Sequence, residues 1–272
     1  NPVDSTVHRG WSAVMLSTLA RSNQVPDFYE LHYYGYAEGT SLLIPVDRAS
    51  DYHLLRSGFY KRRAIERCRE MLCDYFGPVE GSNVAIHVTE ANCAGYDPGK
   101  QFLSLINGLL VPEYFAQACV SGADAFLWWD LHNHPETNFN ISTTLHGWRE
   151  YGDFGILAVG GSVPLGGAVN EPYPPFYGFK LLTNFAWPGS RLVQATNNCY
   201  DTLLTYAAIP ADTGSVRLLV VNVSPDTALR PSIVLDGFTP GASVDVHGYG
   251  IAEDTGRADI TFTNLPIANP LS

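Results

Sequence analysis

Polar and aromatic side chains gather at the ends of three predicted strands, which span residues 28–34, 83–90 and 125–130. The residues at these ends, or just beyond them, are His32, Tyr34, Glu90, Asn92, Trp128 and Trp129. In folds built from alternating helices and parallel strands, functional groups lie beyond the carboxyl ends of the strands, where the connecting loops converge. The sequence therefore predicts a shared site formed by these side chains.

Glu90 is the residue of this set best suited to act as a nucleophile. Side chains alternate between the two faces of a strand, so Glu90 should share a face with Ile86 and Val88 and lie above an apolar layer. His87 should lie on the opposite face, toward the helices. A carboxylate kept ionised and oriented by a tyrosine or histidine can attack an anomeric carbon, as in glycosidases. The pattern therefore indicates chemistry on sugars.

Two of these residues also allow simpler interpretations. Glu90 could form no more than a salt bridge at a strand end, and His32 could be a hydrogen-bonded structural histidine. Glu30 should share the face of His32, and a buried carboxylate there would need a partner such as Arg48 or Lys61. Which of these interpretations holds depends on how the strands orient these side chains.

Helices and strands alternate through the first half of the chain. Helical periodicity covers residues 11–24, 51–76 and 101–121, and each of these stretches precedes one of the three strands. Helices alternating with apolar strands are typical of parallel α/β units, which form a doubly wound sheet or a TIM barrel. The expected fold class of this half is α/β.

The second half, which begins near residue 160, has a different pattern of residues. Glycine pairs at 160–161 and 166–167 and prolines at 172, 174 and 175 indicate a linker, and one helix is expected over 176–185. Short strands separated by turns are predicted over 191–195, 202–208, 216–223, 232–235, 243–249 and 259–263. This spacing is typical of an antiparallel β-sandwich. The predicted division is 1–160 for the α/β part and 161–272 for the linker and sandwich.

The order of these motifs resembles that of the retaining glycoside hydrolases of clan A. The resemblance rests on the strand ends 32–34 and 89–92, on the tryptophan-bearing strand, and on the aromatic and proline-rich stretch 172–182 that precedes the predicted sandwich. Closest in layout are the arabinofuranosidase-, xylosidase- and glucuronidase-like members, in which a (β/α)8 barrel is followed by a β-sandwich. The resemblance covers most of the chain. It implies that residues 1–160 form the C-terminal half of the barrel, from about helix five to strand eight.

The resemblance also implies roles for the site residues. Glu90 corresponds to the nucleophile of a retaining hydrolysis. His32 and Tyr34 correspond to groups of strand six beside it. Trp128 or Trp129 corresponds to a sugar-stacking wall on strand eight, and because the two are adjacent in a strand, only one of them can face the site.

Further implications concern the parts around the nucleophile. Asn92 is expected to be a loop residue near the sugar subsites. The family carries its acid/base glutamate at the end of strand four, and strands one to five are missing from the chain, so the acid/base is expected outside it. A missing N-terminal segment or a second chain would complete the barrel, and both ends of the sequence suggest a fragment.

A second glutamate imitates the acid/base motif. Asn170-Glu171-Pro172 matches the Asn-Glu-Pro found at that position in the clan, but it follows the third strand and lies in the glycine- and proline-rich join. A retaining mechanism requires the two carboxyl groups to lie about 5–5.5 Å apart, and no strand end positions Glu171 for that. A linker is the preferred interpretation.

Composition excludes several classes of function and leaves one alternative open. The 272 residues include 16 Lys+Arg and 27 Asp+Glu, a formal net charge of −11 that has the wrong sign for binding nucleic acid. No apolar stretch is long enough for a membrane span, no signal peptide is visible, and the substrate class favours a secreted or extracellular location. His132 and His134 lack a third ligand, so neither a metal nor a cofactor is expected. The alternative is a non-catalytic carbohydrate-binding or interaction module, or an inactive fragment.

Overall fold

The computed structural model describes residues 8–35, 51–95, 98–136, 147–160, 167–211 and 214–267. The first part of the chain alternates between helices and parallel strands. Its elements are α1 (Trp11–Arg21), β1 (Phe28–Tyr34), α2 (Asp51–Leu55), α3 (Ser57–Phe76), α4 (Pro78–Asn83), β2 (Ala85–Asn92), a short 3-10 helix (Lys100–Leu103), α5 (Leu105–Val120) and β3 (Ala125–Phe126). The strands form a parallel sheet in the order β1-β2-β3, as the sequence predicts.

The differences from the predicted elements of this part are local. The helix expected over 51–76 is divided at Arg56 into α2 and α3, and a short additional helix, α4, follows the break at Gly77. Gly77 has a φ of 91°, which ends α3, and Pro78 then occupies the first position of α4, where its missing N–H costs nothing. The expected strand 125–130 is regular only at Ala125–Phe126, although the chain continues beside β2 as far as Trp129 through a hydrogen bond from its N–H to the Ala91 carbonyl.

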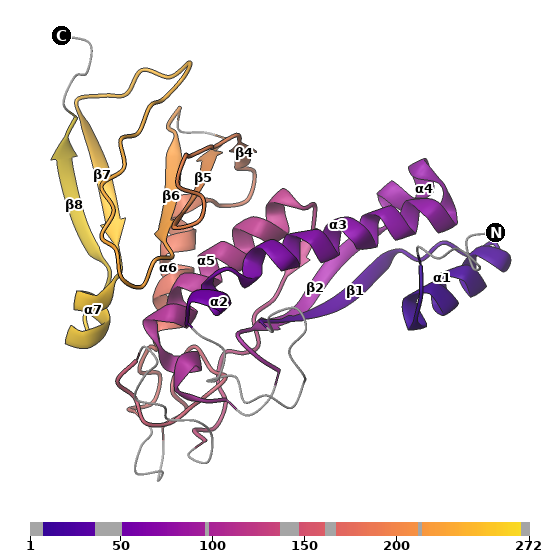
Figure 1. Ribbon diagram of the computed structural model, residues 1–272, viewed down its shortest axis with the longest axis horizontal. Helices are drawn as coiled ribbons and strands as arrows, with labels where there is room; N and C mark the ends of the chain where they lie inside the picture. The colour runs from indigo at the N-terminus through magenta and orange to yellow at the C-terminus, as the bar shows by residue number, and fades with distance from the viewer. Residues whose placement is uncertain are drawn as a thin grey trace.

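Helices α3 and α5 cover one face of this sheet (Figure 1). Ile86 and Val88 of β2 point into that layer and are completely buried. Apolar side chains surround much of α5, where Leu110, Val111 and Tyr114 are at most 1% exposed. The helices and the inner face of the sheet therefore form the main core, which positions the strand ends.

Helix α6 (Pro174–Phe185) packs closely against α5 because glycines lie at the contact. A Cβ atom at Gly178 would lie 2.4 Å from the carbonyl oxygen of Gly108, and one at Gly108 would lie 2.9 Å from the carbonyl oxygen of Pro174. A side chain at either position would push the helices apart.

The second part of the chain contains two antiparallel sheets. Strands β4 (Arg191–Val193), β5 (Leu203–Ile209) and β6 (Arg217–Asn222) form one of them, and β7 (Ser243–Gly248) and β8 (Thr261–Pro266) form the other. A helix that the sequence did not predict, α7 (Ile251–Gly256), connects β7 to β8. Both sheets lie at the end of the molecule opposite α1 and α4 (Figure 1).

One predicted strand of this part is wrong. Residues 232–235 are irregular, and Ile233 and Val234 are 56% and 88% exposed. A strand needs a neighbour to bond its backbone and cover its apolar face, and this segment has neither within the described part of the chain. The β-sandwich therefore stays a prediction, while the antiparallel pairing is confirmed for β4–β6 and β7–β8.

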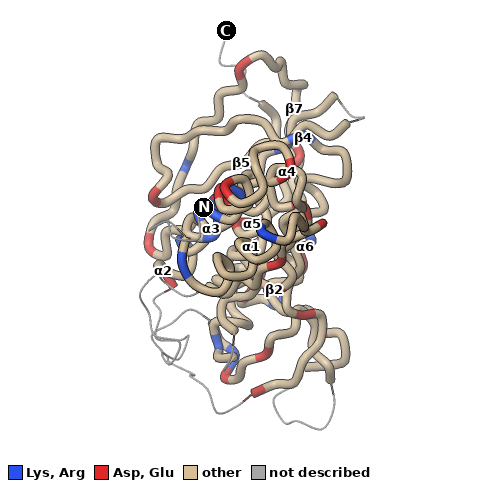
Figure 2. Tube along the Cα trace, turned by 90° about the vertical axis from the view of Figure 1, so that its right-hand side faces the viewer, with Lys and Arg blue, Asp and Glu red and all other residues tan. Residues whose placement is uncertain are grey.

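The core is continuous from the first part of the chain into the second. Leu204, Ala208, Leu219 and Val221 of the β4–β6 sheet belong to the same buried cluster as the helices and the parallel sheet. Acidic and basic residues are interspersed along the chain in the view of Figure 2. Among the described helices, none combines the length and the apolar character needed to cross a membrane.

Candidate active site

The parallel pairing of β1 with β2 brings the predicted nucleophile beside its predicted neighbours. His32 pairs with Glu90 across the two strands, and Tyr34 pairs with Asn92. Because the pairing is parallel, the carboxyl ends of both strands lie at the same edge of the sheet. The predicted convergence of Glu90, His32 and Tyr34 is therefore confirmed by the geometry.

Both neighbours contact one oxygen of the Glu90 carboxylate. The Tyr34 hydroxyl donates a hydrogen bond to Oε2, and His32 Nδ1 lies 3.2 Å from the same atom. The other ring nitrogen of His32, Nε2, is 3.7 Å from Glu30 Oε1. The Glu90 side chain is 25% exposed, so a reactant can reach the carboxylate. This arrangement fixes the orientation of the carboxylate.

A β-bulge changes which face Glu90 occupies. Leu31 pairs with Val88 but His32 pairs with Glu90, so one residue of β2 is left over. Ile86 and Val88 point toward the helices, whereas Glu90 points the other way. The expectation that Glu90 lies on the Ile86 and Val88 face, above an apolar layer, is therefore wrong.

His87 also lies on the other face from the one expected. It pairs with Glu30 across the parallel strands, and its ring stacks on Phe28 at a centroid distance of 5.1 Å. Paired residues of parallel strands share a face, so His87 lies on the face of Glu30 and Glu90 and away from the helices. This face is polar near the candidate nucleophile.

The two tryptophans point in different directions, as their adjacency requires. Trp128 packs inside the molecule, with an edge-to-face contact to Phe179 of α6 at 6.0 Å and a tilted contact to Tyr114 of α5 at 6.3 Å. Trp129 is 42% exposed, and its N–H bonds the Ala91 carbonyl at the end of β2. Trp129 is thus the tryptophan that remains available to a ligand.

The prediction for Asn92 is wrong, because this residue ends β2 and is completely buried rather than lying in a loop near sugar subsites. Its side-chain nitrogen donates to the backbone carbonyls of Trp129 and Phe154, and its oxygen accepts from Asn107 and from the Cys93 N–H. Asn92 therefore fixes the segment that carries Trp129. Its amide has no capacity left for a sugar.

Glu30 is half exposed, so it does not need the buried cationic partner that was considered for it. Lys61 lies on the helix side instead, 6% exposed, and its Nζ donates to the backbone carbonyl of Tyr34 and lies 3.9 Å from the centre of the Tyr33 ring. Burial lowers the pKa of Lys61 well below its usual range, against the opposing effect of Glu113. Arg48 lies outside the described residues.

A buried carboxylate that no sequence pattern predicts, Asp153, lies near Asp130. Asp153 is 1% exposed, and burial raises its pKa from 3.8 to about 6, with the nearby charge of Asp130 as a further contribution. Burial also raises the pKa of Asp130, which follows Trp129. Asp153 Oδ1 accepts the Gly155 N–H at 2.8 Å. No motif marks Asp153 in the sequence, because only the folded loop 147–160 buries it beside Asp130.

Asp153→Asn is expected to remove part of the pH dependence of stability. The raised pKa means that the folded state binds more protons than the unfolded state, so wild-type stability falls as the pH rises from about 4 to 7. The variant cannot ionise but keeps the oxygen that accepts the Gly155 N–H. Relative to the variant, the wild type should lose about 2 kcal/mol over this range. Urea unfolding of both proteins at pH 4 and pH 7 measures the difference, and a difference independent of pH would contradict the assignment.

Glu171 and His132, which the sequence also offered as candidates, make contacts that support the fold. Glu171 Oε2 accepts the Ala168 N–H at 3.0 Å within its own turn, and Asn170 adopts a φ of 63° and contacts His132 at 2.8 Å. These contacts fit the linker interpretation of the Asn-Glu-Pro motif. Across the described ranges, no group of three His, Cys, Asp or Glu side chains is arranged to hold a metal ion.

Comparison with family models and with curated proteins gives no match for this chain. Solved structures do match it. CelM2, a bifunctional glucanase-xylanase from a metagenome library, is 16% identical, with a TM-score of 0.58 over 94% of this chain and 43% of that protein. The alpha-L-arabinofuranosidase of Thermotoga petrophila RKU-1 is 13% identical, with a TM-score of 0.56 over 89% of this chain and 49% of that one. The alpha-L-arabinofuranosidase of Thermotoga maritima is 15% identical, with a TM-score of 0.56 over 93% and 51%.

These similarities establish the fold. The chain is folded like part of a TIM-barrel glycoside hydrolase, and the resemblance predicted from the sequence is confirmed at that level. It spans about half, or less, of the length of the structures that it matches. Consistent with this, the three parallel strands among the described residues form an open sheet and not a closed barrel.

Proposed function

We propose that this chain carries the nucleophile of a retaining glycoside hydrolase, with Glu90 in that role. The observation that carries the proposal is the contact of Tyr34 and His32 with one oxygen of the Glu90 carboxylate, at the carboxyl edge of a parallel sheet. A carboxylate held in this way by neighbouring donors is oriented for attack. The fold shared with glucanase-xylanase and arabinofuranosidase structures supports a carbohydrate substrate.

In the proposed reaction, a Glu90 oxygen forms a bond to the anomeric carbon while the bond from that carbon to the leaving oxygen breaks. An acid protonates the leaving oxygen. Water, deprotonated by the same group, then displaces Glu90 and releases the sugar with its original anomeric configuration. The Tyr34 hydroxyl orients the carboxylate in both steps, and the exposed Trp129 offers an aromatic face for the sugar.

The proposal places the acid/base outside this chain. Residues 1–160 would then be the C-terminal half of a (β/α)8 barrel, completed by a further segment or a second chain, and residues 161–272 a linker and a β-sandwich. A native mass spectrum of the protein isolated from its source tests this. A mass well above 29.7 kDa, from a longer chain or a complex, is expected. A 29.7 kDa species that turns over aryl glycosides would contradict this placement of the acid.

Tyr34→Phe is expected to lower kcat on aryl glycosides about 10- to 100-fold, since the carboxylate loses one charge-assisted hydrogen bond. The variant keeps the ring, so stability should change little. Tyr60→Phe is the matched control, because Tyr60 lies on α3 and is 50% exposed. Steady-state kinetics of the assembled enzyme measure both. A Tyr34→Phe variant with the kcat of the control would exclude the orienting role.

A further inference from the structure

A cavity lies on the opposite side of helices α3 and α5 from the candidate active site. It is a cleft of about 650 Å³ between helices α3 and α5 and the β4–β6 sheet. This volume is in the range of about 300–1,000 Å³ that is usual for small-molecule sites. None of Glu90, His32, Tyr34 or Trp129 contributes to its lining. The cleft is therefore separate from the proposed catalytic groups.

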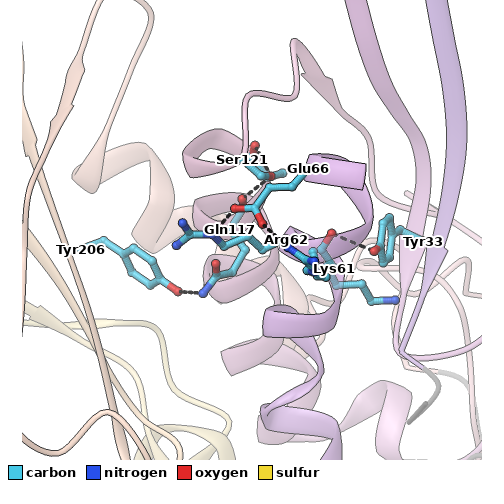
Figure 3. Close-up of polar contacts among 9 residues, drawn as sticks. Tyr33, Lys61, Arg62, Glu66, Gln117, Ser121 and Tyr206 are labelled. Carbon is cyan, nitrogen blue, oxygen red and sulfur yellow. Dashed lines mark hydrogen bonds and ion pairs between the residues drawn. The ribbon is translucent and has the colours of Figure 1, made fainter. Parts of the chain in front are cut away.

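Aromatic rings and an amide line this cleft. Phe59 of α3 and Tyr200, in the loop before β5, are 37% and 64% exposed, so their rings are accessible from solvent. Gln117 of α5 donates its amide N–H to the Tyr206 hydroxyl of β5 at 2.7 Å, which joins the two sides of the cleft (Figure 3). Accessible rings can stack on the C–H faces of a ligand, while the amide and hydroxyl at the base form hydrogen bonds.

The polar groups at the base retain hydrogen-bonding capacity. Gln117 is 3% exposed, and its side-chain oxygen is buried without a hydrogen-bond partner among the described residues. Tyr206 accepts the Gln117 N–H, and burial raises the pKa of Tyr206 above its usual range, so its own O–H remains available as a donor. An alcohol group both donates and accepts, and therefore complements this pair.

Charge in the cleft is balanced. Arg62 is the one charged residue among the described residues of the lining, and its Nε donates to Glu66 Oε1 at 2.7 Å (Figure 3). The described lining contains no Asp or Glu, so it lacks the pair of carboxyl groups with which most glycoside hydrolases cleave the glycosidic bond. The remaining polar lining consists of uncharged amides and hydroxyls, from Gln194, Thr196, Asn197 and Thr205. Such a lining favours a neutral ligand.

We infer that this cleft is a non-catalytic binding site for the end of a neutral oligosaccharide. A sugar combines an apolar C–H face, suited to Tyr200 and Phe59, with hydroxyls suited to Gln117 and Tyr206. This inference goes beyond the proposed hydrolysis, because the cleft can bind sugars whether or not Glu90 is a nucleophile.

Titration calorimetry of the assembled enzyme with xylotetraose, arabinotetraose and cellotetraose tests the inference. At least one of them is expected to bind with a Kd on the order of 0.1–1 mM. Tyr200→Ala should raise that Kd at least tenfold, and Tyr206→Phe about three- to tenfold. Tyr200 is 64% exposed, so its replacement leaves the fold intact and keeps the test valid even if Tyr206→Phe is destabilising.

Two control variants separate this cleft from other surfaces. Phe262→Ala removes a ring of β8 that is 61% exposed and does not line the cleft, and Glu90→Gln alters the candidate active site. Both should keep the wild-type Kd within twofold. Absence of binding by all three sugars, an unchanged Kd in Tyr200→Ala, or loss of binding in Glu90→Gln would overturn the inference. Tighter binding of tetragalacturonate than of the neutral sugars would overturn the assigned ligand class.

Discussion

Glu90→Gln is expected to lower kcat on aryl glycosides by about four orders of magnitude or more, as the loss of a catalytic nucleophile does in other enzymes. Glutamine keeps the size of the side chain and an oxygen that can accept the Tyr34 hydroxyl, so the fold should be retained. The measurement is steady-state kinetics of the assembled enzyme, with thermal unfolding of each protein as a check on folding.

Glu70→Gln is the matched control for this change, since Glu70 is an exposed carboxylate of α3, on the helix side of the sheet, whereas Glu90 lies on the other face. It should retain wild-type kcat. Turnover by Glu90→Gln within tenfold of this control would show that Glu90 is not the nucleophile.

Azide distinguishes a nucleophile from a carboxylate with a supporting role. In Glu90→Ala, azide can enter the space left by the side chain and attack the anomeric carbon of a dinitrophenyl glycoside, whose leaving group needs no protonation. The single displacement gives a glycosyl azide with inverted configuration. Appearance of this product only in the alanine variant supports the proposed role, and faster release of free sugar without a glycosyl azide argues against it.

Lys61→Ala is expected to destabilise the protein by about 3 kcal/mol. Lys61 is 6% exposed, and its Nζ donates to the Tyr34 carbonyl and lies over the Tyr33 ring. Its removal leaves that partly buried carbonyl without this donor and opens a cavity beneath the end of β1. The same change should lower activity, because the Tyr34 backbone carries the hydroxyl that orients Glu90.

Urea unfolding measures the change in stability, with Arg63→Ala as the control. Arg63 lies on the same helix, is 60% exposed and is 4.0 Å from Glu66, so its replacement should cost less than about 0.5 kcal/mol. A Lys61→Ala variant as stable as Arg63→Ala would contradict the assigned role of the buried Lys61 side chain. Retained activity in a destabilised variant would show that Lys61 supports the fold but does not position Tyr34.

The alternation of helices and strands could be predicted because each element has its own local periodicity. The parallel sheet of β1, β2 and β3 and the strand ends that carry Glu90 and His32 follow from that pattern. The bulge before Glu90 could not be predicted, since it arises from the register of one strand against another. The extra residue of β2 places Glu90 and His87 on the same face of the sheet, whereas strict alternation along the strand predicts opposite faces.

Tertiary packing determines the orientation and burial of the remaining site residues. Contacts with Phe179 and Tyr114 place Trp128 inside and leave Trp129 exposed, although the two residues are chemically identical in the sequence. Asn92 is expected from the sequence to contact a sugar, but it is buried. Its amide instead forms hydrogen bonds with backbone groups of loops that are distant in sequence. Lys61 matters through the Tyr34 carbonyl, a contact across 27 positions that no spacing rule indicates.

The most direct test of the central claim is to trap the covalent intermediate on the assembled enzyme. The probes are dinitrophenyl 2-deoxy-2-fluoro glycosides of arabinofuranose, xylose and glucose, in which fluorine slows both chemical steps and the activated leaving group speeds the first. Peptide mapping by mass spectrometry should then find one fluorosugar attached to Glu90, and none in Glu90→Gln. A label on another carboxylate, or turnover of the natural substrate with inversion and no label, would contradict the assignment of Glu90.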